Sequence, residues 1–194
     1  MSQATLRTAR LELVPLAPQH GDFLYQLDAD PDVMKYIGYG KPLDAKDSKI
    51  VHKLLLETAA PGTGLGCWAA FSGRDFVGWW VLAATQSHVT PSQSGKIRAE
   101  FGLRVLPKFW GQGLAKEGSR ELLKHGFQDL GVDEIFGETM TVNKGSRATM
   151  ASCGLNHVRT FHNQYDTPPP GIEEGEVEYR ITKEEWLSMD PARK

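Results

Sequence analysis

Two glycines, Gly111 and Gly113, lie where an apolar strand pattern gives way to a long helical pattern. The segment that contains them, residues 107–113, reads PKFWGQG, and we call it the glycine loop. A glycine turn that leads into a helix exposes unpaired backbone N–H groups at the positive end of the helix dipole. Such a turn is suited to phosphate or pyrophosphate groups, so the sequence predicts an anionic ligand here.

Three phosphate-binding motifs place glycines at a turn of this kind. A dinucleotide-binding fingerprint requires a third glycine, where this chain has Lys116, and an acidic residue after the next strand, where it has Asn143. A mononucleotide P-loop requires Gly-Lys-Ser/Thr directly after the loop, but residues 113–115 read GLA. A coenzyme A pyrophosphate site remains, beside the simpler interpretation that the glycines only form a tight turn.

The composition excludes several classes of protein. The 194 residues carry 22 Lys and Arg against 24 Asp and Glu, a net charge of -2 that is too balanced for a nucleic-acid-binding protein. Only Cys67 and Cys153 are present, with no histidine at ligand spacing, so we expect neither disulfides nor a metal site. The chain begins without an apolar signal region, and its longest apolar or glycine run, residues 77–84, is too short to span a membrane. We therefore expect a cytoplasmic protein that binds no membrane.

Hydrophobic periodicity and turn residues predict a single domain over residues 1–194. The expected strands cover residues 10–16, 67–71, 76–84, 97–105, 135–142, 155–161 and 177–181. The expected helices cover residues 18–29, 33–37, 45–58, 111–130 and 143–152, and residues 85–95 are expected to form an exposed loop. This order predicts an α/β fold of the mixed α+β kind, with a central, mostly antiparallel sheet of about seven strands and helices on both faces.

Helical spacing also predicts which side chains are buried. The expected inward residues are Leu114, Leu122, Leu123 and Phe127 in helix 111–130, and Ile50, Val51, Leu54 and Leu55 in helix 45–58. Trp79, Trp80 and Trp110 are expected in the core or over the sheet, because the interleaved basic residues that base stacking requires are absent.

The glycine loop and the segments around it resemble the GNAT superfamily of acyl-CoA N-acetyltransferases. The family's loop follows the pattern Gln/Arg-x-x-Gly-x-Gly/Ala, and residues 108–113 read KFWGQG, with Lys108 in the first position. Motifs of the branch that contains the ribosomal-protein N-terminal acetyltransferases occur here in order, over about residues 5–185. They are Thr-x-Arg-Leu at 8–11, Asp-Pro-x-Val-Met at 30–34, Phe-Trp-Gly-x-Gly-x-Ala at 109–115, Asn-x-x-Ser at 143–146 and Cys-Gly at 153–154.

The resemblance implies a GNAT-like fold in which a splayed strand pair holds acetyl-CoA as cosubstrate, with no metal. The residues that it implies for binding are Leu103, Arg104, Val105, Lys108, Phe109, Trp110, Gly111, Gln112, Gly113, Leu114, Ala115, Asn143 and Ser146. The strand backbone would hold the pantetheine arm, the glycine loop the phosphates, and Asn143 the pantetheine near the second strand. Asn143 and Ser146 suit a helix-capping pair equally well.

The same resemblance implies catalytic roles. Ser146 would stabilise or protonate the leaving thiolate, because the position at which many relatives carry a general-acid Tyr is Met150 here. Glu100 would accept a proton from the amine, directly or through water, and Glu138 on the neighbouring strand is the second candidate base. Each glutamate could also be an ordinary solvent-facing strand residue.

We expect the acceptor to be a primary amine, and a protein or peptide N-terminal α-amine ahead of a lysine side chain. An α-amine has a pKa of about 7.7–8.0 against about 10.4 for Lys, so a far larger fraction is neutral at pH 7. The expected acceptor residues are Tyr36, Tyr39, Asp166, Glu173 and Glu174, in a mouth between residues 30–40 and 164–176. The alternatives are a small-amine acetyltransferase for a polyamine, amino acid or drug, and a non-catalytic CoA-binding sensor. A homodimer is also expected.

Overall fold

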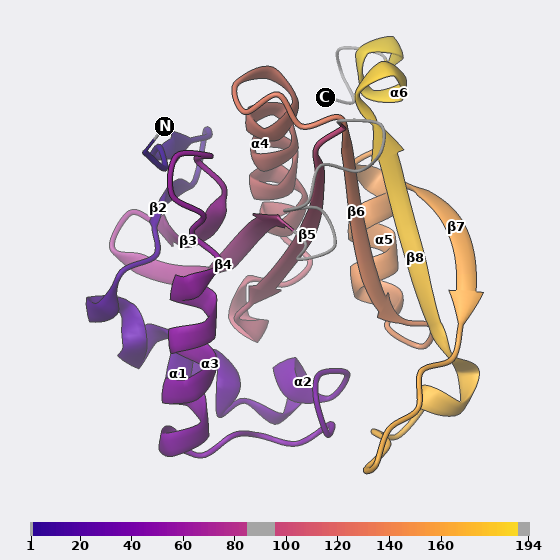
Figure 1. Cartoon of the computed structure of the whole chain (residues 1–194). Coiled ribbons are helices and arrows are strands. Elements are labelled where there is room, and N and C mark those ends of the chain that lie inside the picture. Colours follow the sequence, from indigo (N-terminus) through magenta and orange to yellow (C-terminus); the bar gives the residue numbers. More distant parts are fainter. Residues whose placement is uncertain (1, 85–95, 190–194) are drawn as a thin grey trace.

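The computed structural model describes residues 2–84 and 96–189 (Figure 1). The loop expected at residues 85–95 therefore lies outside the described residues. Eight strands form one sheet in the order β1-β2-β3-β4-β5-β6-β8-β7. They are β1 (Leu6–Arg7), β2 (Glu12–Pro15), β3 (Gly66–Ser72), β4 (Asp75–Ala84), β5 (Arg98–Val105), β6 (Glu134–Met140), β7 (Asn156–Phe161) and β8 (Glu176–Thr182).

The pairing of the strands confirms a mixed, mostly antiparallel sheet. Only β5 and β6 run parallel among the neighbouring pairs of the described sheet. The strand that the sequence analysis did not predict is β1, which has two residues and pairs Leu6 with Leu13 of β2. A segment of this length is too short for strand periodicity to be visible.

Helices cover both faces of the sheet. They are η1 (Pro18–His20), α1 (Gly21–Asp28), α2 (Pro31–Met34), α3 (Ala45–Glu57), η3 (Pro107–Phe109), α4 (Leu114–Gln128), α5 (Lys144–Ser152), η4 (Ile172–Glu174) and α6 (Lys183–Ser188). In Figure 1, α1 and α3 lie in front of the sheet and α4 and α5 lie behind it. The helix α6 was not predicted, although Thr182 and Glu185 form a capping box at its start.

Each face of the sheet has its own apolar core. Leu114, Leu122, Leu123 and Phe127 of α4 are buried in the larger core, as predicted. Trp79 and Trp80 are also buried as predicted, and Trp79 belongs to the second core, under α1. The prediction for Trp110 was wrong, because half of its surface is exposed.

The buried face of α3 agrees with the prediction only in part: Leu55 packs against the second core as predicted, and Val51 is half-buried. Ile50 and Leu54 are more than half exposed, whereas Ser48 and His52 are buried. The Ser48 hydroxyl donates a 2.7 Å hydrogen bond to the carboxylate of Asp28, which is itself buried in α1. The helix therefore turns a polar side toward α1 to satisfy a buried carboxylate, and this requirement is not visible in its own periodicity.

The parallel strands β5 and β6 separate part of the way along their length. They pair at Arg98, Ala99 and Glu100, opposite Glu134, Ile135 and Phe136, and not beyond. After Glu100, β5 stays paired with β4 and β6 stays paired with β8, so a wedge-shaped gap opens between them (Figure 1). Within the described residues, no helix is both long and apolar enough to cross a bilayer.

Candidate active site

A cavity of about 800 Å³ occupies the gap between β5 and β6. Its walls come from α2 and the residues after it, from β4, β5, the glycine loop, β6, α5 and the start of β8. Ten of the residues expected to bind the cosubstrate line it: Leu103, Arg104, Val105, Phe109, Trp110, Gly111, Gly113, Ala115, Asn143 and Ser146. Lys108, Gln112 and Leu114 do not line it.

The glycine loop takes a conformation that glycine alone adopts without strain. Gly111 has φ 71° and Gly113 has φ 78°, both in the left-handed region. A Cβ atom at Gly111 would meet no protein atom within 4 Å, so this side of the loop is open. The N–H groups of residues 111–113 have no hydrogen-bond partner among the described residues, and the first turn of α4 adds further unpaired donors. The loop therefore presents a concentrated set of donors to an anion.

Arg10 holds the glycine loop in place from the start of the chain. Its guanidinium donates to the carbonyl of Gln112 at 2.9 Å and pairs with the carboxylate of Glu117 in α4 at 2.6 Å. The hydroxyl of Thr8 donates to the same carboxylate at 2.6 Å, and these bonds lower the pKa of Glu117 against the opposing effect of burial. The Thr-x-Arg motif thus fixes the loop and the first turn of α4 relative to each other.

Trp110 extends this wall of the cavity. Its indole Nε1–H donates to the carbonyl of Val105 at 2.7 Å. The ring is held at the end of β5, half exposed beside Gly111.

Asn143 and Ser146 lie on the opposite wall, where β6 leads into α5. The side chain of Asn143 accepts from the backbone N–H of Ser146 at 3.2 Å, which makes it the N-cap of α5, and donates to the hydroxyl of Thr139 at 3.1 Å. The Ser146 hydroxyl has no hydrogen-bond partner within the described part of the chain and lines the cavity. Asn143 therefore caps α5 and also lines the cavity, while the hydroxyl of Ser146 is available to a ligand.

Two glutamates lie on the β5 and β6 walls. The side chain of Glu100 faces the cavity, and the surrounding protein raises its pKa, an effect that Arg98 partly opposes. Burial also raises the pKa of Glu138, and the neighbouring carboxylates of Glu178 and Glu100 raise it further. Arg159 of β7 lies 3.4 Å from Glu138 and opposes these effects. Raised pKa values suit a carboxylate that accepts a proton from an amine near neutral pH.

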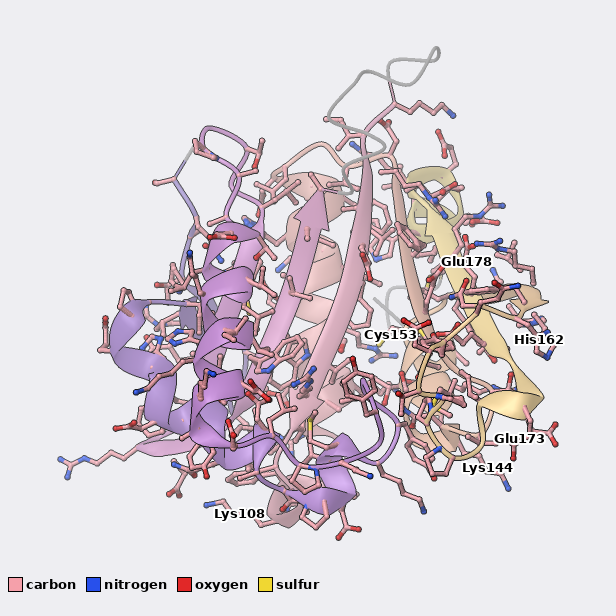
Figure 2. The ribbon with its side chains drawn as sticks, turned by 60° about the horizontal axis from the view of Figure 1, so that its bottom comes forward. Lys108, Lys144, Cys153, His162, Glu173 and Glu178 are labelled. Carbon is pink, nitrogen blue, oxygen red and sulfur yellow. The ribbon has the colours of Figure 1, made fainter. Side chains whose placement is uncertain are left out.

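The structure brings only part of the expected acceptor set to the cavity. Tyr36 lines it, and Glu176, from the second segment of the expected mouth, does so too. The two segments meet beside the cavity, because a Cβ atom at Gly40 would lie 3.0 Å from the ring of Pro170. The remaining four are exposed and outside the lining: Tyr39, Asp166, Glu173 and Glu174. Figure 2 shows Glu173 at the outer side of the molecule, with its side chain directed outward.

Several cavity residues were not predicted. Asp32, Trp79, Thr139 and Glu176 all line it. Arg104 also lines it, although only its backbone was expected to contact the cosubstrate. Strand alternation places Glu100 and Arg104 on one face of β5, and this signal was available in the sequence. No local pattern marks Asp32 or Glu176, which come from segments far away in the chain.

The residues present fit coenzyme A. Free N–H groups and positive-φ glycines at a helix start suit its pyrophosphate, and the gap beside β5 is open along the strand. Lys108 follows β5 and Lys144 follows β6, and Figure 2 shows both side chains at the lower edge of the molecule, directed outward. Among the described residues, no group of three or more His, Cys, Asp or Glu side chains is placed to hold a metal ion.

Comparisons with known proteins agree with this geometry. The family described as "Acetyltransferase (GNAT) domain" matches residues 10–156. The FsC-acetyl coenzyme A-N(2)-transacetylase of Aspergillus fumigatus is 54% identical over 188 residues, which are 97% of this chain and 80% of that protein.

Solved structures of low sequence identity share the fold. A ribosomal L7/L12 alpha-N-protein acetyltransferase in complex with coenzyme A has a TM-score of 0.74 at 13% identity, covering 92% of this chain and 98% of that one. Spermidine N-acetyltransferase from Vibrio cholerae, in complex with CoA and spermine, has a TM-score of 0.71 at 16% identity, covering 93% and 100%. Taken with the sequence matches, this chain belongs to the GNAT family and is an N-acetyltransferase that uses acetyl-CoA.

Proposed function

We propose that the enzyme transfers the acetyl group of acetyl-CoA to the α-amine of a small, positively charged molecule. The observation that carries this proposal is the charge of the cavity. Four carboxylates line it: Asp32, Glu100, Glu138 and Glu176. The one Lys or Arg side chain in the described lining is Arg104, whose charge is paired with Asp28 at 2.6 Å. The acceptor side therefore favours a cation.

In this proposal Glu100 is the general base. A raised pKa brings its carboxylate closer to that of an ammonium group, so proton transfer from the acceptor costs less. The neutral amine then attacks the thioester carbonyl carbon, and the acetyl group passes to nitrogen as the C–S bond breaks. Neither cysteine takes part as a nucleophile, since Cys67 and Cys153 are buried and burial raises the pKa of both thiols.

The leaving thiolate needs a proton or a hydrogen bond. Ser146 is on the α5 wall with a hydroxyl that is free within the described part of the chain, and it supports this role. The position at which many relatives carry a Tyr is occupied by Met150, whose side chain is buried and offers no proton. Ser146 or water therefore completes the reaction.

A similar enzyme, as well as the charge of the cavity, supports the proposed class of acceptor. The enzyme that is 54% identical is named for FsC and for transfer to an N(2) nitrogen, which supports an amine acceptor of the kind that this name states. A peptide N-terminus is the second candidate, supported by the sequence motifs of the ribosomal-protein branch and by the same pKa argument.

The test is a panel of amines assayed by release of free CoA, with the acetylated nitrogen identified by mass spectrometry. The panel contains FsC, amino acid amides, polyamines, and lysine-containing peptides with free and blocked N-termini. We expect the highest kcat/KM with a small α-amine. Transfer to free-N-terminal peptides alone would support the second candidate, and transfer to polyamines or blocked peptides alone would refute an α-amine acceptor.

A further inference from the structure

The guanidinium of Arg104 is held in the wall of the cavity with part of its donor set unused. Its Nη1 donates to the carboxylate of Asp28 at 2.6 Å and lies 3.7 Å from the sulfur of Met34. The side chain is 13% exposed, and it lines the cavity. Arginine has five N–H donors, and the Nε and Nη2 donors of Arg104 have no partner among the described residues.

The buried carboxylate of Asp28 fixes the position of this guanidinium. Asp28 accepts from Arg104 through one carboxylate oxygen and from the Ser48 hydroxyl through the other, at 2.7 Å. Both oxygens of the buried carboxylate are thus engaged, by a strand on one side and by α3 on the other. An arginine held in this way presents its remaining donors with little loss of side-chain entropy when a ligand binds.

A second unused donor lies next to it. Trp79 is the residue of β4 that pairs with Arg104 of β5, and the guanidinium carbon lies 5.2 Å from the centre of the indole ring. Trp79 lines the cavity and is 6% exposed, yet its Nε1–H is buried without a hydrogen-bond partner in the described structure. The indole N–H is a donor only, and a buried donor without a partner is costly, so this group calls for an oxygen acceptor.

We infer that Arg104 and Trp79 form a subsite for a carbonyl or carboxylate oxygen of the acceptor. This inference rests on the proposed function and specifies its substrate further: the molecule carries a carbonyl group as well as the amine. Glu100 and Arg104 are four residues apart on one face of β5, about 13 Å along the strand, and both side chains point into the same cavity. Glu100 accepts the amine proton through an intervening water, which spans the separation between the two side chains, and the donor pair holds the oxygen.

A purely structural role for the two residues makes a different prediction. If Trp79 only fills the core, removal of an unpaired N–H by Trp79→Phe is neutral or stabilising and leaves substrate preference unchanged. If Arg104 only neutralises Asp28, Arg104→Lys retains the ion pair and also leaves preference unchanged. The subsite requires both variants to change the preference between acceptors with and without a carbonyl.

The experiment compares L-lysine amide with cadaverine, which has the same carbon chain without the carboxamide. The readout is the ratio of kcat/KM for the two amines, because effects on folding or on acetyl-CoA binding cancel in it. We expect the ratio to fall about fivefold in Trp79→Phe and about tenfold or more in Arg104→Lys, mainly through KM for lysine amide. Trp80→Phe is the matched control: it removes an indole N–H that donates to Ser119 in the other core, and the ratio stays as in the wild type.

Two results would overturn the inference in distinguishable ways. If the wild type acetylates both amines and the ratio is the same in Trp79→Phe and Arg104→Lys, the subsite is wrong and the proposed function stands. If the wild type releases no CoA with any amine of the panel, the proposed function fails and the inference fails with it. Trp79→Phe keeps the test decisive should Arg104→Lys not fold.

Discussion

The two sides of the cavity are built in different ways. The glycine loop acts through backbone N–H groups within one short stretch of chain, fixed by Arg10 and the start of α4. The carboxylate side depends on side chains from four separate elements, α2, β5, β6 and β8, which contribute Asp32, Glu100, Glu138 and Glu176 in that order. In the proposed arrangement, a cosubstrate common to a whole family would be bound by local geometry, while the acceptor would be selected by side chains that can change one at a time.

The largest expected effect comes from the carboxylate side. Glu100→Gln removes the proposed base while keeping the shape of the side chain, and we expect kcat to fall by roughly 10²–10⁴-fold with CoA affinity unchanged. Steady-state kinetics with a saturating amine and calorimetry with CoA measure the two quantities. Glu138→Gln is the comparison; a larger loss of kcat in this variant would make Glu138 the base instead.

Glu100→Gln is expected to lower activity but, relative to wild type, to raise stability as the pH increases. Desolvation by the surrounding protein, partly opposed by Arg98, raises the pKa of Glu100 in the folded protein above its value in the unfolded chain. Its contribution to stability is therefore full below the unfolded pKa, about 4.3, and is lost as pH rises through the folded pKa. We expect the Tm of Glu100→Gln, relative to wild type, to be higher at pH 7.5 than at pH 4. In the wild type, kcat/KM should fall as pH decreases through that raised pKa.

A weaker but still large effect is expected on the glycine-loop side. Gly111→Val puts a branched side chain at φ 71° and into the open side of the loop. We expect CoA affinity to fall by about 100-fold, because the side chain occupies the open side of the loop and charge-assisted hydrogen bonds to the phosphates are lost, while backbone strain of ~1–2 kcal/mol lowers stability. Calorimetry measures the affinity, and circular dichroism checks that the variant folds.

The β3–β4 turn provides the matched control for strain. Gly73 has φ 60°, and a Cβ there also meets no atom within 4 Å, but it lies outside the cavity. Gly73→Val should lose stability and keep CoA affinity. Equal affinity in folded Gly111→Val and in wild type would remove the glycine loop from CoA binding.

The smallest effect is expected at Ser146. Ser146→Ala removes a hydroxyl that is free within the described part of the chain. It keeps the backbone N–H of residue 146, which donates to the Asn143 side chain, so α5 retains its cap. We expect kcat to fall about tenfold with little change in acetyl-CoA affinity, because the bond matters most when charge develops on sulfur. Ser152→Ala in the same helix, outside the cavity, should change neither. An equal loss of kcat and of affinity in Ser146→Ala would mark the hydroxyl as a binding group.

The two sides also differed in how well the sequence predicted them. The glycine loop could be located because its glycines, its helix and its strand are contiguous, and the strands and helices of the mixed sheet followed from periodicity. The acceptor side was predicted only in part. Glu100, Glu138 and Tyr36 were named as candidates and line the cavity, but Asp32 and Glu176 were not, because they reach the cavity only through the tertiary fold. Arg104 and Ser48 show the same limit, since each faces a buried partner, Asp28, that no local pattern indicates. The Thr-x-Arg motif is visible in the sequence, but its role in holding the loop depends on bonds to Gln112 and Glu117, about 100 residues away in the chain.

The separation of β5 from β6 also has a mechanical consequence. Within the described sheet, strand pairing between the half formed by β1–β5 and the half formed by β6–β8 is limited to three residue pairs of β5 and β6. Local opening follows the boundaries of cooperative units, and this seam is a natural boundary. Amide hydrogens of β5 that face the gap should exchange with solvent faster than those paired with β4. A molecule that fills the gap slows this exchange by joining the two halves, so substrate occupancy and the cohesion of the fold are linked.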